Sequence, residues 1–173
     1  MKTSLEDGTV ISLRAPEPAD LPFLYRLEND ESIWTVSGNC APYSQRQLEE
    51  YIKNSVHDLF AEHQVRFVIE VNGHQAGCID LTDIQTVQSR AQVGVALLPE
   101  YRGQSIAANS LSLLCGYSKD RLRLFQLYAL VPLSNVPSLH LFESMGFVKS
   151  GCLSDWIWLG GKYDDVAFLQ KKL

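Results

Sequence analysis

Residues 93–117 constrain the fold of this chain more than any other segment. The apolar run at 93–98 is typical of a strand, and the apolar residues at 106–117 have the spacing of a helix. A short polar loop containing Arg102 and Gly103 joins the two runs. Backbone N–H groups and the positive end of a helix dipole converge at such a loop, so it can bind phosphate. The segment therefore predicts an α/β protein that uses a phosphate-bearing ligand.

Alternation and helical spacing predict the other elements. Strands are expected at 9–14, 66–71, 75–81, 91–98, 125–131, 147–153 and 163–170. Helices are expected near 19–27, after the capping pair Ser44 and Gln47, and over 105–119 and 136–144. Asn72-Gly73 and Gly160-Gly161 predict turns. This order predicts one α/β domain over residues 1–173, with a mixed sheet of about six to seven strands and about four helices.

Composition excludes several classes of function. The net charge is −5 and no basic cluster is visible, so a nucleic-acid partner is not expected, whereas a cationic substrate is compatible. Four cysteines and four histidines are scattered without metal-ligand spacing, so we expect no metal site and no disulfide framework. No apolar run reaches the length of a membrane span, and the first residues lack the apolar stretch of a signal peptide. We therefore expect no membrane partner and a cytoplasmic location.

A second segment, residues 135–147, identifies the ligand. It begins at Asn135 and continues as a short helix that ends in Gly146-Phe147. Together with the loop at 102–107, it resembles the two signatures of the GNAT superfamily, the acyl-CoA-dependent N-acyltransferases. The spacing of the two motifs and the order of elements match along nearly the whole chain. The resemblance implies a GNAT fold, acetyl-CoA as co-substrate, and direct acetyl transfer to a primary amine without a metal.

The resemblance also implies a coenzyme site. The loop would hold the pyrophosphate, the edge of the preceding strand would pair with the pantetheine arm, and a residue of the second motif would orient the thioester. On this chain the cofactor-binding residues would be Val95, Ala96, Leu97, Arg102, Gly103, Gln104, Ser105, Ile106, Ala107, Asn135 and Phe142.

Three positions depart from the family pattern. Ser105 replaces the usual central glycine of the loop, and we expect the site to survive if Ser105 lies in the helical region of φ/ψ. Phe142 stands where many members carry a tyrosine that protonates the departing thiolate. Gln92 lies on the strand where many members carry a glutamate base, and glutamine cannot accept that proton. The usual acid and the usual base are therefore both missing.

Two side chains are candidates for the missing acid. Ser138 can donate a hydrogen bond to the leaving sulfur, or it can cap the start of its own helix. Tyr128 is the second candidate, although a tyrosine in a central strand is typical of packing. N–H groups beside Val95 and Ala96 can polarise the thioester carbonyl. Asp80, Asp83 and Glu31 are available as bases, but transfer to a neutral amine can rest on proximity without one.

The N-terminal part of the chain narrows the choice of acceptor substrate. The segments 12–16 and 28–30 look like the branch that holds ribosomal-protein N-terminal acetyltransferases and bacterial spermidine acetyltransferases. Residues 66–70 and the acidic early region favour a polyamine such as spermidine. A protein N-terminal acetyltransferase and a catalytically weak CoA-binding sensor are the alternatives.

Two sets of side chains could meet a polyamine. The candidate substrate-binding carboxylates are Glu28, Glu31 and Asp83. Trp34, Trp156 and Trp158 could flank an alkylammonium chain, but they are equally typical of core packing or of a homo-oligomer interface.

Overall fold

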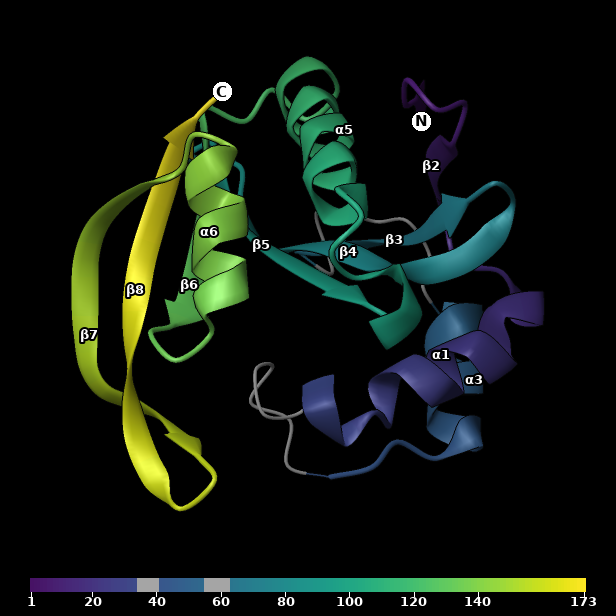
Figure 1. Cartoon of the computed structure of the whole chain (residues 1–173), viewed down its shortest axis with the longest axis horizontal. Coiled ribbons are helices and arrows are strands. Elements are labelled where there is room, and N and C mark those ends of the chain that lie inside the picture. Colours follow the sequence, from purple (N-terminus) through teal and green to yellow (C-terminus); the bar gives the residue numbers. More distant parts are fainter. Residues whose placement is uncertain (34–40, 55–62) are drawn as a thin grey trace.

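One mixed sheet of eight strands organises the chain (Figure 1). The computed structural model describes residues 1–33, 41–54 and 63–173. The strands are β1 (Lys2–Ser4), β2 (Val10–Arg14), β3 (Val65–Val71), β4 (His74–Gln85), β5 (Arg90–Leu97), β6 (Gln126–Pro132), β7 (Val148–Leu159) and β8 (Lys162–Lys172). Their order in the sheet is β1-β2-β3-β4-β5-β6-β8-β7. The predicted α/β class with a mixed sheet is confirmed. The strand count exceeds the prediction because β1, only three residues long, carries no readable alternation.

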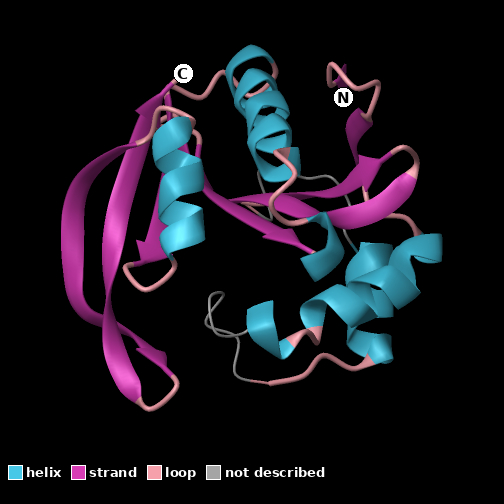
Figure 2. Ribbon diagram, in the orientation of Figure 1, coloured by secondary structure: helices cyan, strands magenta, loops and turns pink. Residues whose placement is uncertain are grey.

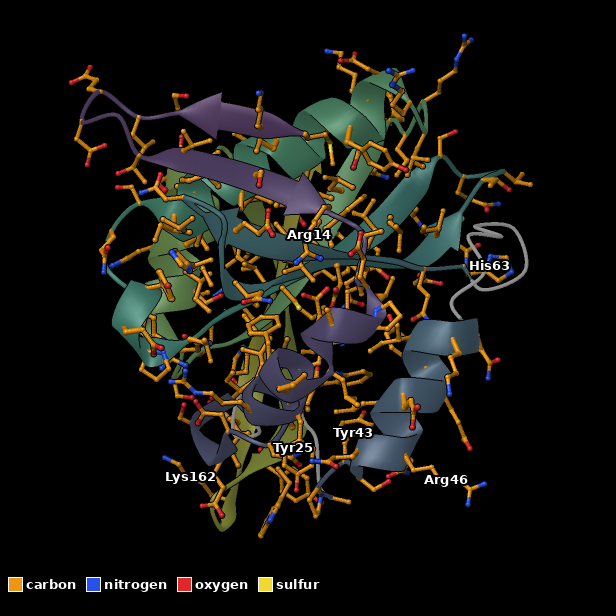
Figure 3. All side chains as sticks on the ribbon, turned by 90° about the vertical axis from the view of Figure 1, so that its right-hand side faces the viewer. Arg14, Tyr25, Tyr43, Arg46, His63 and Lys162 are labelled. Carbon is orange, nitrogen blue, oxygen red and sulfur yellow. The ribbon has the colours of Figure 1, made fainter. Side chains whose placement is uncertain are left out.

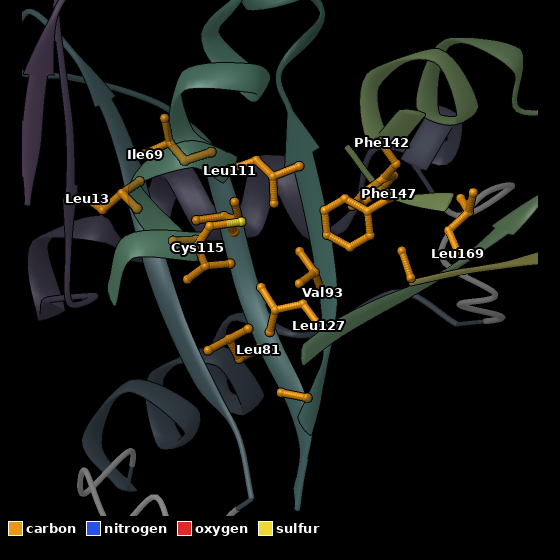
Figure 4. Close-up of a cluster of buried hydrophobic side chains, with 14 of the residues drawn as sticks. Leu13, Ile69, Leu81, Val93, Leu111, Cys115, Leu127, Phe142, Phe147 and Leu169 are labelled. Atoms are coloured by element: carbon orange, nitrogen blue, oxygen red, sulfur yellow. The ribbon is translucent and has the colours of Figure 1, made fainter. Parts of the chain in front are cut away.

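Helices cover both faces of this sheet (Figures 1 and 2). The helices α1 (Leu21–Glu28) and α3 (Gln45–Asn54) lie on one face, and α5 (Ile106–Asp120) and α6 (Val136–Ser144) lie on the other. Each face has its own core: Leu111 of α5 belongs to the larger cluster shown in Figure 4, and Leu24 of α1 to a smaller one. No helix within the described ranges is long and apolar enough to cross a membrane.

The capping pair at the start of α3 forms as predicted. The Ser44 N–H donates to Gln47 Oε1 at 2.9 Å, and the Gln47 N–H donates to Ser44 Oγ at 3.2 Å. Leu48 and Ile52 then point into the smaller core. The remainder of the predicted helical face, at 55–59, lies outside the described residues.

The two parallel strands part after a short pairing. β5 and β6 pair only from Arg90 with Gln126 to Gln92 with Tyr128. Beyond that point residues 93–97 of β5 remain paired with β4 but have no partner on β6. We call this opening, between 93–97 of β5 and 129–132 of β6, the fork. It lies at the carboxyl ends of two parallel strands, which is where sheets of this kind bind ligands.

A charged network ties β2 to the turn that leads into α1. Asp20 is only 1% exposed and accepts hydrogen bonds from Arg14 at 2.6 and 2.8 Å, from the Glu17 N–H at 2.7 Å and from Gln75 at 3.1 Å. Arg14 also donates to Glu70 at 2.7 Å. Figure 3 shows Arg14 at the end of β2, beside α1. The network fixes the α1 layer against the sheet.

The hairpin of β7 and β8 is longer than predicted. β7 continues to Leu159 rather than ending at residue 153, and the predicted Gly160-Gly161 turn is confirmed by positive φ values of 56° and 101°. β7 is an edge strand that bulges twice, between Lys149 and Gly151 and between Leu153 and Ile157. These bulges interrupt the ladder without ending it, which periodicity alone does not reveal.

Candidate active site

The loop before α5 presents a row of unpaired backbone donors. After the 3-10 turn Pro99–Tyr101, Gly103 has a φ of 74° and Ser105 a φ of 58° with a ψ of 7°. The first backbone bond into α5 runs from the Asn109 N–H to the Ser105 carbonyl. Among the described residues, the N–H groups of 103–108 therefore donate to no protein acceptor. We call this row of N–H groups the cradle.

The condition set for Ser105, a helical φ/ψ, is not met. Ser105 occupies the left-handed region rather than the helical one, because the chain must turn from extended Arg102 into α5. A residue with a Cβ pays about 1–2 kcal/mol in that region, whereas glycine does not. The serine still supplies its N–H to the cradle, at the expense of local strain.

Ser105→Gly is expected to raise the free energy of unfolding by about 0.5–1 kcal/mol, because relief of the strained φ outweighs the added chain entropy. Urea unfolding measures the change. Ser112→Gly, at an exposed helical position of α5, is the matched control and should lower the same quantity by about 0.5 kcal/mol. If both substitutions lowered the free energy of unfolding by similar amounts, Ser105 would not be strained.

Arg102 lies across the end of β5. Its Nε donates to the Leu97 carbonyl at 3.0 Å, and a terminal nitrogen donates to Ser32 Oγ at 3.3 Å. Gln104 donates to the Glu100 carbonyl at 2.7 Å and closes the 3-10 turn. Arg102 is exposed beside the cradle, so its charge is available to an anion there, and its predicted role stays a prediction.

Alternation along β5 decides which groups face the fork. The Leu98 N–H donates to the Ala76 carbonyl on the β4 side. The N–H and C=O groups of successive residues point to opposite sides of a strand. The N–H and C=O of Ala96 therefore also face β4, whereas those of Val95 and Leu97 point into the fork. Of the two residues expected to polarise a thioester, only Val95 can offer an N–H there.

Tyr128 and Asp83 meet beside the closed end of the fork. The Tyr128 hydroxyl donates to Asp83 Oδ2 at 2.7 Å, and the Tyr128 ring stacks on Phe168 at 5.3 Å. Burial and the bond to Asp83 raise the pKa of Tyr128 to about 12, so the hydroxyl stays protonated at neutral pH. Hydrogen bonds from Gln85 and Tyr128 lower the pKa of Asp83, which remains charged. The sequence suggested these two residues for separate roles, and the structure brings them together.

A cavity of about 210 Å³ lies between the α1–α3 layer and strands β3 and β4. In its wall, Arg66 donates to Glu28 at 2.6 Å and to Asp80 at 2.8 and 2.9 Å. The Tyr51 ring lies 5.5 Å from the Arg66 guanidinium. Further lining residues are Tyr43, Gln47, Leu48, Gln64, Val65, Leu81 and Thr82.

The structure separates the predicted substrate carboxylates. Glu28 lines the cavity and Asp83 lies at the fork, next to the lining residue Thr82, whereas Glu31 is exposed. Trp34 lies outside the described residues. Sequence reasoning missed Tyr43 and Tyr51. The pairing of Arg66 with Asp80 was not readable from the sequence. The hairpin turn at 72–73 alone would set Arg66 opposite Ile79, and a register shift between Ile69 and Glu70 places it opposite Asp80.

Comparison with known proteins identifies this arrangement. A family model described as "Acetyltransferase (GNAT) domain" matches residues 11–148. The chain belongs to the GNAT acetyltransferases. As the sequence predicted, it is an acetyl-CoA-dependent N-acetyltransferase.

Relatives of this GNAT chain are similar over almost their full length. The spermidine N(1)-acetyltransferase of Vibrio cholerae is 30% identical over 157 residues, which cover 90% of this chain and 89% of the relative. A crystal structure of the V. cholerae spermidine N-acetyltransferase in complex with CoA and spermine has a TM-score of 0.87 at 29% identity and covers 94% and 95% of the two chains. A dodecameric structure of the same enzyme has a TM-score of 0.79 at 28% identity and covers 94% and 93%.

The second GNAT motif forms the first turn of α6. Asn135 is the N-cap residue, and its Oδ1 accepts a hydrogen bond from the Ser138 N–H at 3.2 Å. The sequence left two roles open for Ser138, a hydrogen bond to the leaving sulfur or a cap on its own helix. The structure shows that Asn135, and not Ser138, caps the helix. Within the described ranges the Ser138 hydroxyl makes no hydrogen bond, and it is half-buried at the N-terminal end of α6.

Phe142 contributes packing in this GNAT chain. Its side chain is 3% exposed and lies edge to face with Phe147 at 5.0 Å (Figure 4). Its assignment to the coenzyme site stays a prediction. Since Phe142 has no proton to donate and Gln92 cannot act as a base, the polar groups at hand near the fork are Ser138, Tyr128 and Asp83.

The residues present fit the coenzyme of this family. Acetyl-CoA bears a pyrophosphate and an extended amide-containing arm. The cradle offers consecutive unpaired N–H groups at the positive end of the α5 dipole, and the β5 edge offers unpaired backbone groups at Val95. A Cβ at Gly103 would meet no atom within 4 Å, so the loop is open on that side.

Proposed function

We propose that this GNAT enzyme acetylates a primary amine of a polyamine such as spermidine. The cavity under α1 and α3 carries the proposal. Its ionic groups are the carboxylates of Glu28 and Asp80 and the guanidinium of Arg66, which sum to one net negative charge. Tyr43 and Tyr51 add aromatic faces, which attract alkylammonium groups. The spermidine acetyltransferases to which the chain is similar support the same acceptor.

The coenzyme supplies an acetyl group activated as a thioester. In this proposal the cradle at 103–108, with Arg102, binds the pyrophosphate. The backbone of Val95 and the Leu97 N–H pair with the pantetheine arm. Asn135 orients the thioester end of that arm from the start of α6. The strand edge thus holds the reacting carbon at the fork, where its proximity to a bound amine lowers the barrier to transfer.

Three groups of the chain act on the reacting atoms. The Val95 N–H polarises the thioester carbonyl. Asp83, oriented by Tyr128, holds the substrate ammonium until that nitrogen loses its proton to water. The nitrogen–carbon bond then forms, the carbon–sulfur bond breaks, and the nitrogen releases a further proton to water. The Ser138 hydroxyl gives its proton to the departing sulfur and regains one from water. Glu31, exposed on the surface beyond the end of α1, adds negative charge that attracts the cation.

A panel of amines tests the acceptor. Release of CoA thiol, followed with a thiol reagent, is expected to be at least about tenfold more efficient with spermidine than with N-terminal peptides. Glu28→Gln should raise the KM for spermidine about fivefold, because it removes one cavity charge, and leave the affinity for acetyl-CoA unchanged. Glu49→Gln, which alters an exposed ion pair of α3, is the matched control and should leave the KM unchanged.

Two other results would replace the proposal. Faster turnover with peptides would identify a protein N-terminal acetyltransferase. If the protein turned over none of the amines but acetyl-CoA raised its Tm, it would be a CoA-binding sensor.

The proposal includes a homo-oligomer in the cytoplasm. The dodecameric V. cholerae structure supports self-association, and the mild negative charge of the chain suits a small cationic substrate.

A further inference from the structure

A glycine of β4 lies where any side chain would collide with β5. A Cβ added at Gly77 would stand 2.2 Å from the Ala96 carbonyl oxygen, 2.6 Å from Leu97 Cδ2 and 3.0 Å from Leu97 Cα. Atoms that are not bonded to each other pack best at about 3.5–4.0 Å, so a Cβ fits here only if the backbone moves. Among the glycines that the structure describes, the next closest contact of an added Cβ is 3.8 Å, from Gly151 to Phe168 Cβ.

A β-bulge in β4 explains why position 77 is directed at β5. The register of β3 with β4 shifts between Ile69 and Glu70, which leaves Ala76 as an extra residue on β4. Residues two apart on a regular strand share a face, but Ala76 belongs to the larger core and Cys78 to the smaller one. The two faces of β4 therefore exchange at Gly77, and a side chain there would lie in the plane of the sheet, toward β5.

β5 is the strand that would yield to a side chain at position 77. β4 is paired on both flanks, with β3 and with β5, and the residues on either side of Gly77 are almost completely buried. Residues 93–97 of β5, in contrast, have no partner on the β6 side, where the ribbons of β5 and β6 diverge in Figure 1. A Cβ at Gly77 would therefore push the peptide between Ala96 and Leu97 into the fork.

We propose that Gly77 is a positioning residue for the coenzyme, because it lets β5 lie close enough to β4 to keep the fork open. It acts through the Leu97 N–H, which points into the fork and donates to no protein acceptor within the described ranges. This inference rests on the pairing of the pantetheine arm with β5 in the proposed function. A side chain at position 77 would move that N–H by about 1 Å, and a displacement of this size can cost about 100-fold in rate.

Calorimetric titration of Gly77→Ala with two ligands tests this role. The dissociation constant of CoA should rise about tenfold, because the hydrogen bonds to the pantetheine arm are lost or weakened. That of phosphoadenosine diphosphate, which lacks the arm, should change by less than about twofold, because the cradle is not altered. The kcat with spermidine should fall about 100-fold. Gly151→Ala, at a strand glycine with room for a Cβ, is the matched control and should leave all three values unchanged.

A second substitution separates the backbone collision from the side-chain collision. Leu97→Ala removes Cδ2 but leaves the Ala96 carbonyl in place. Adding it to Gly77→Ala should therefore not restore the affinity for CoA. Restored affinity in the double variant, equal losses for the two ligands, or unchanged binding of CoA by Gly77→Ala would each overturn the positioning role.

Nuclear magnetic resonance of the unmodified protein decides the matter if Gly77→Ala does not fold. The Gly77 α-protons should show strong nuclear Overhauser contacts to a Leu97 methyl group, and their absence would overturn the role of Gly77. CoA should slow the hydrogen exchange of the Leu97 amide at least about tenfold, whereas the Ala96 amide, which faces β4, should exchange slowly throughout. A Leu97 amide that CoA does not protect would instead overturn the proposed placement of the arm, and with it the role of Gly77.

Discussion

Replacing Asp20 with alanine is expected to lower the free energy of unfolding by about 3–5 kcal/mol. Asp20 is almost completely buried, and its carboxylate accepts four hydrogen bonds, two of them from Arg14. Removing it leaves the Arg14 guanidinium short of an acceptor and the Glu17 N–H unpaired in the turn before α1. Urea unfolding at neutral pH measures the loss. Asp120→Ala, at the exposed end of α5, is the control and should change stability by less than about 0.5 kcal/mol.

The same carboxyl gives the chain a defined acid sensitivity. Burial would raise the pKa of Asp20, but the hydrogen bonds from Arg14, the Glu17 N–H and Gln75 lower it to about 2. The unfolded value is near 3.9, so this stabilisation is complete above about pH 4 and is lost as the pH falls toward 2. Asp20→Asn carries no titrating group and should show a smaller fall of stability over that interval. Equal falls in both proteins would contradict the assignment.

Replacing Ser138 with alanine is expected to lower kcat for acetyl transfer on the order of 100-fold. The Ser138 hydroxyl is free of hydrogen bonds among the described residues, and it lies one turn into α6 beside Asn135. No tyrosine is present at position 142 to protonate the sulfur. Because Asn135 rather than Ser138 caps the helix, the substitution removes a proton donor without removing the cap.

The measurements for Ser138→Ala are kcat with spermidine, the dissociation constant of acetyl-CoA and the Tm. Only kcat should change substantially. Ser144→Ala, on the same helix with its hydroxyl bonded to the Leu141 carbonyl, is the matched control and should retain activity. If Ser138→Ala retained full kcat, the donor would be Tyr128 or water. If its Tm fell sharply, a structural role for the hydroxyl would explain the loss.

Local chemistry made much of the fold readable from the sequence. The capping pair of Ser44 and Gln47, the hairpin turn at 72–73 and the run from β5 into α5 depend on residues a few positions apart, and all three form as expected. The paired motifs at 102–107 and 135–147 sufficed to identify the family. The conformation of Ser105 could not be predicted from the sequence, because its φ is imposed by the direction in which α5 leaves the sheet, which no neighbouring residue encodes.

The sequence by itself determined the element types, the α/β class and the identity of the coenzyme, because strand alternation, helical spacing and two short motifs are properties of short segments. Only the tertiary structure decided which polar side chains share a site. Tyr128 reaches Asp83 across 45 positions, Arg66 reaches Glu28 across 38, and Arg14 reaches Glu70 across 56. Such pairs depend on sheet order and register, which fix distances between segments that the linear chain leaves free.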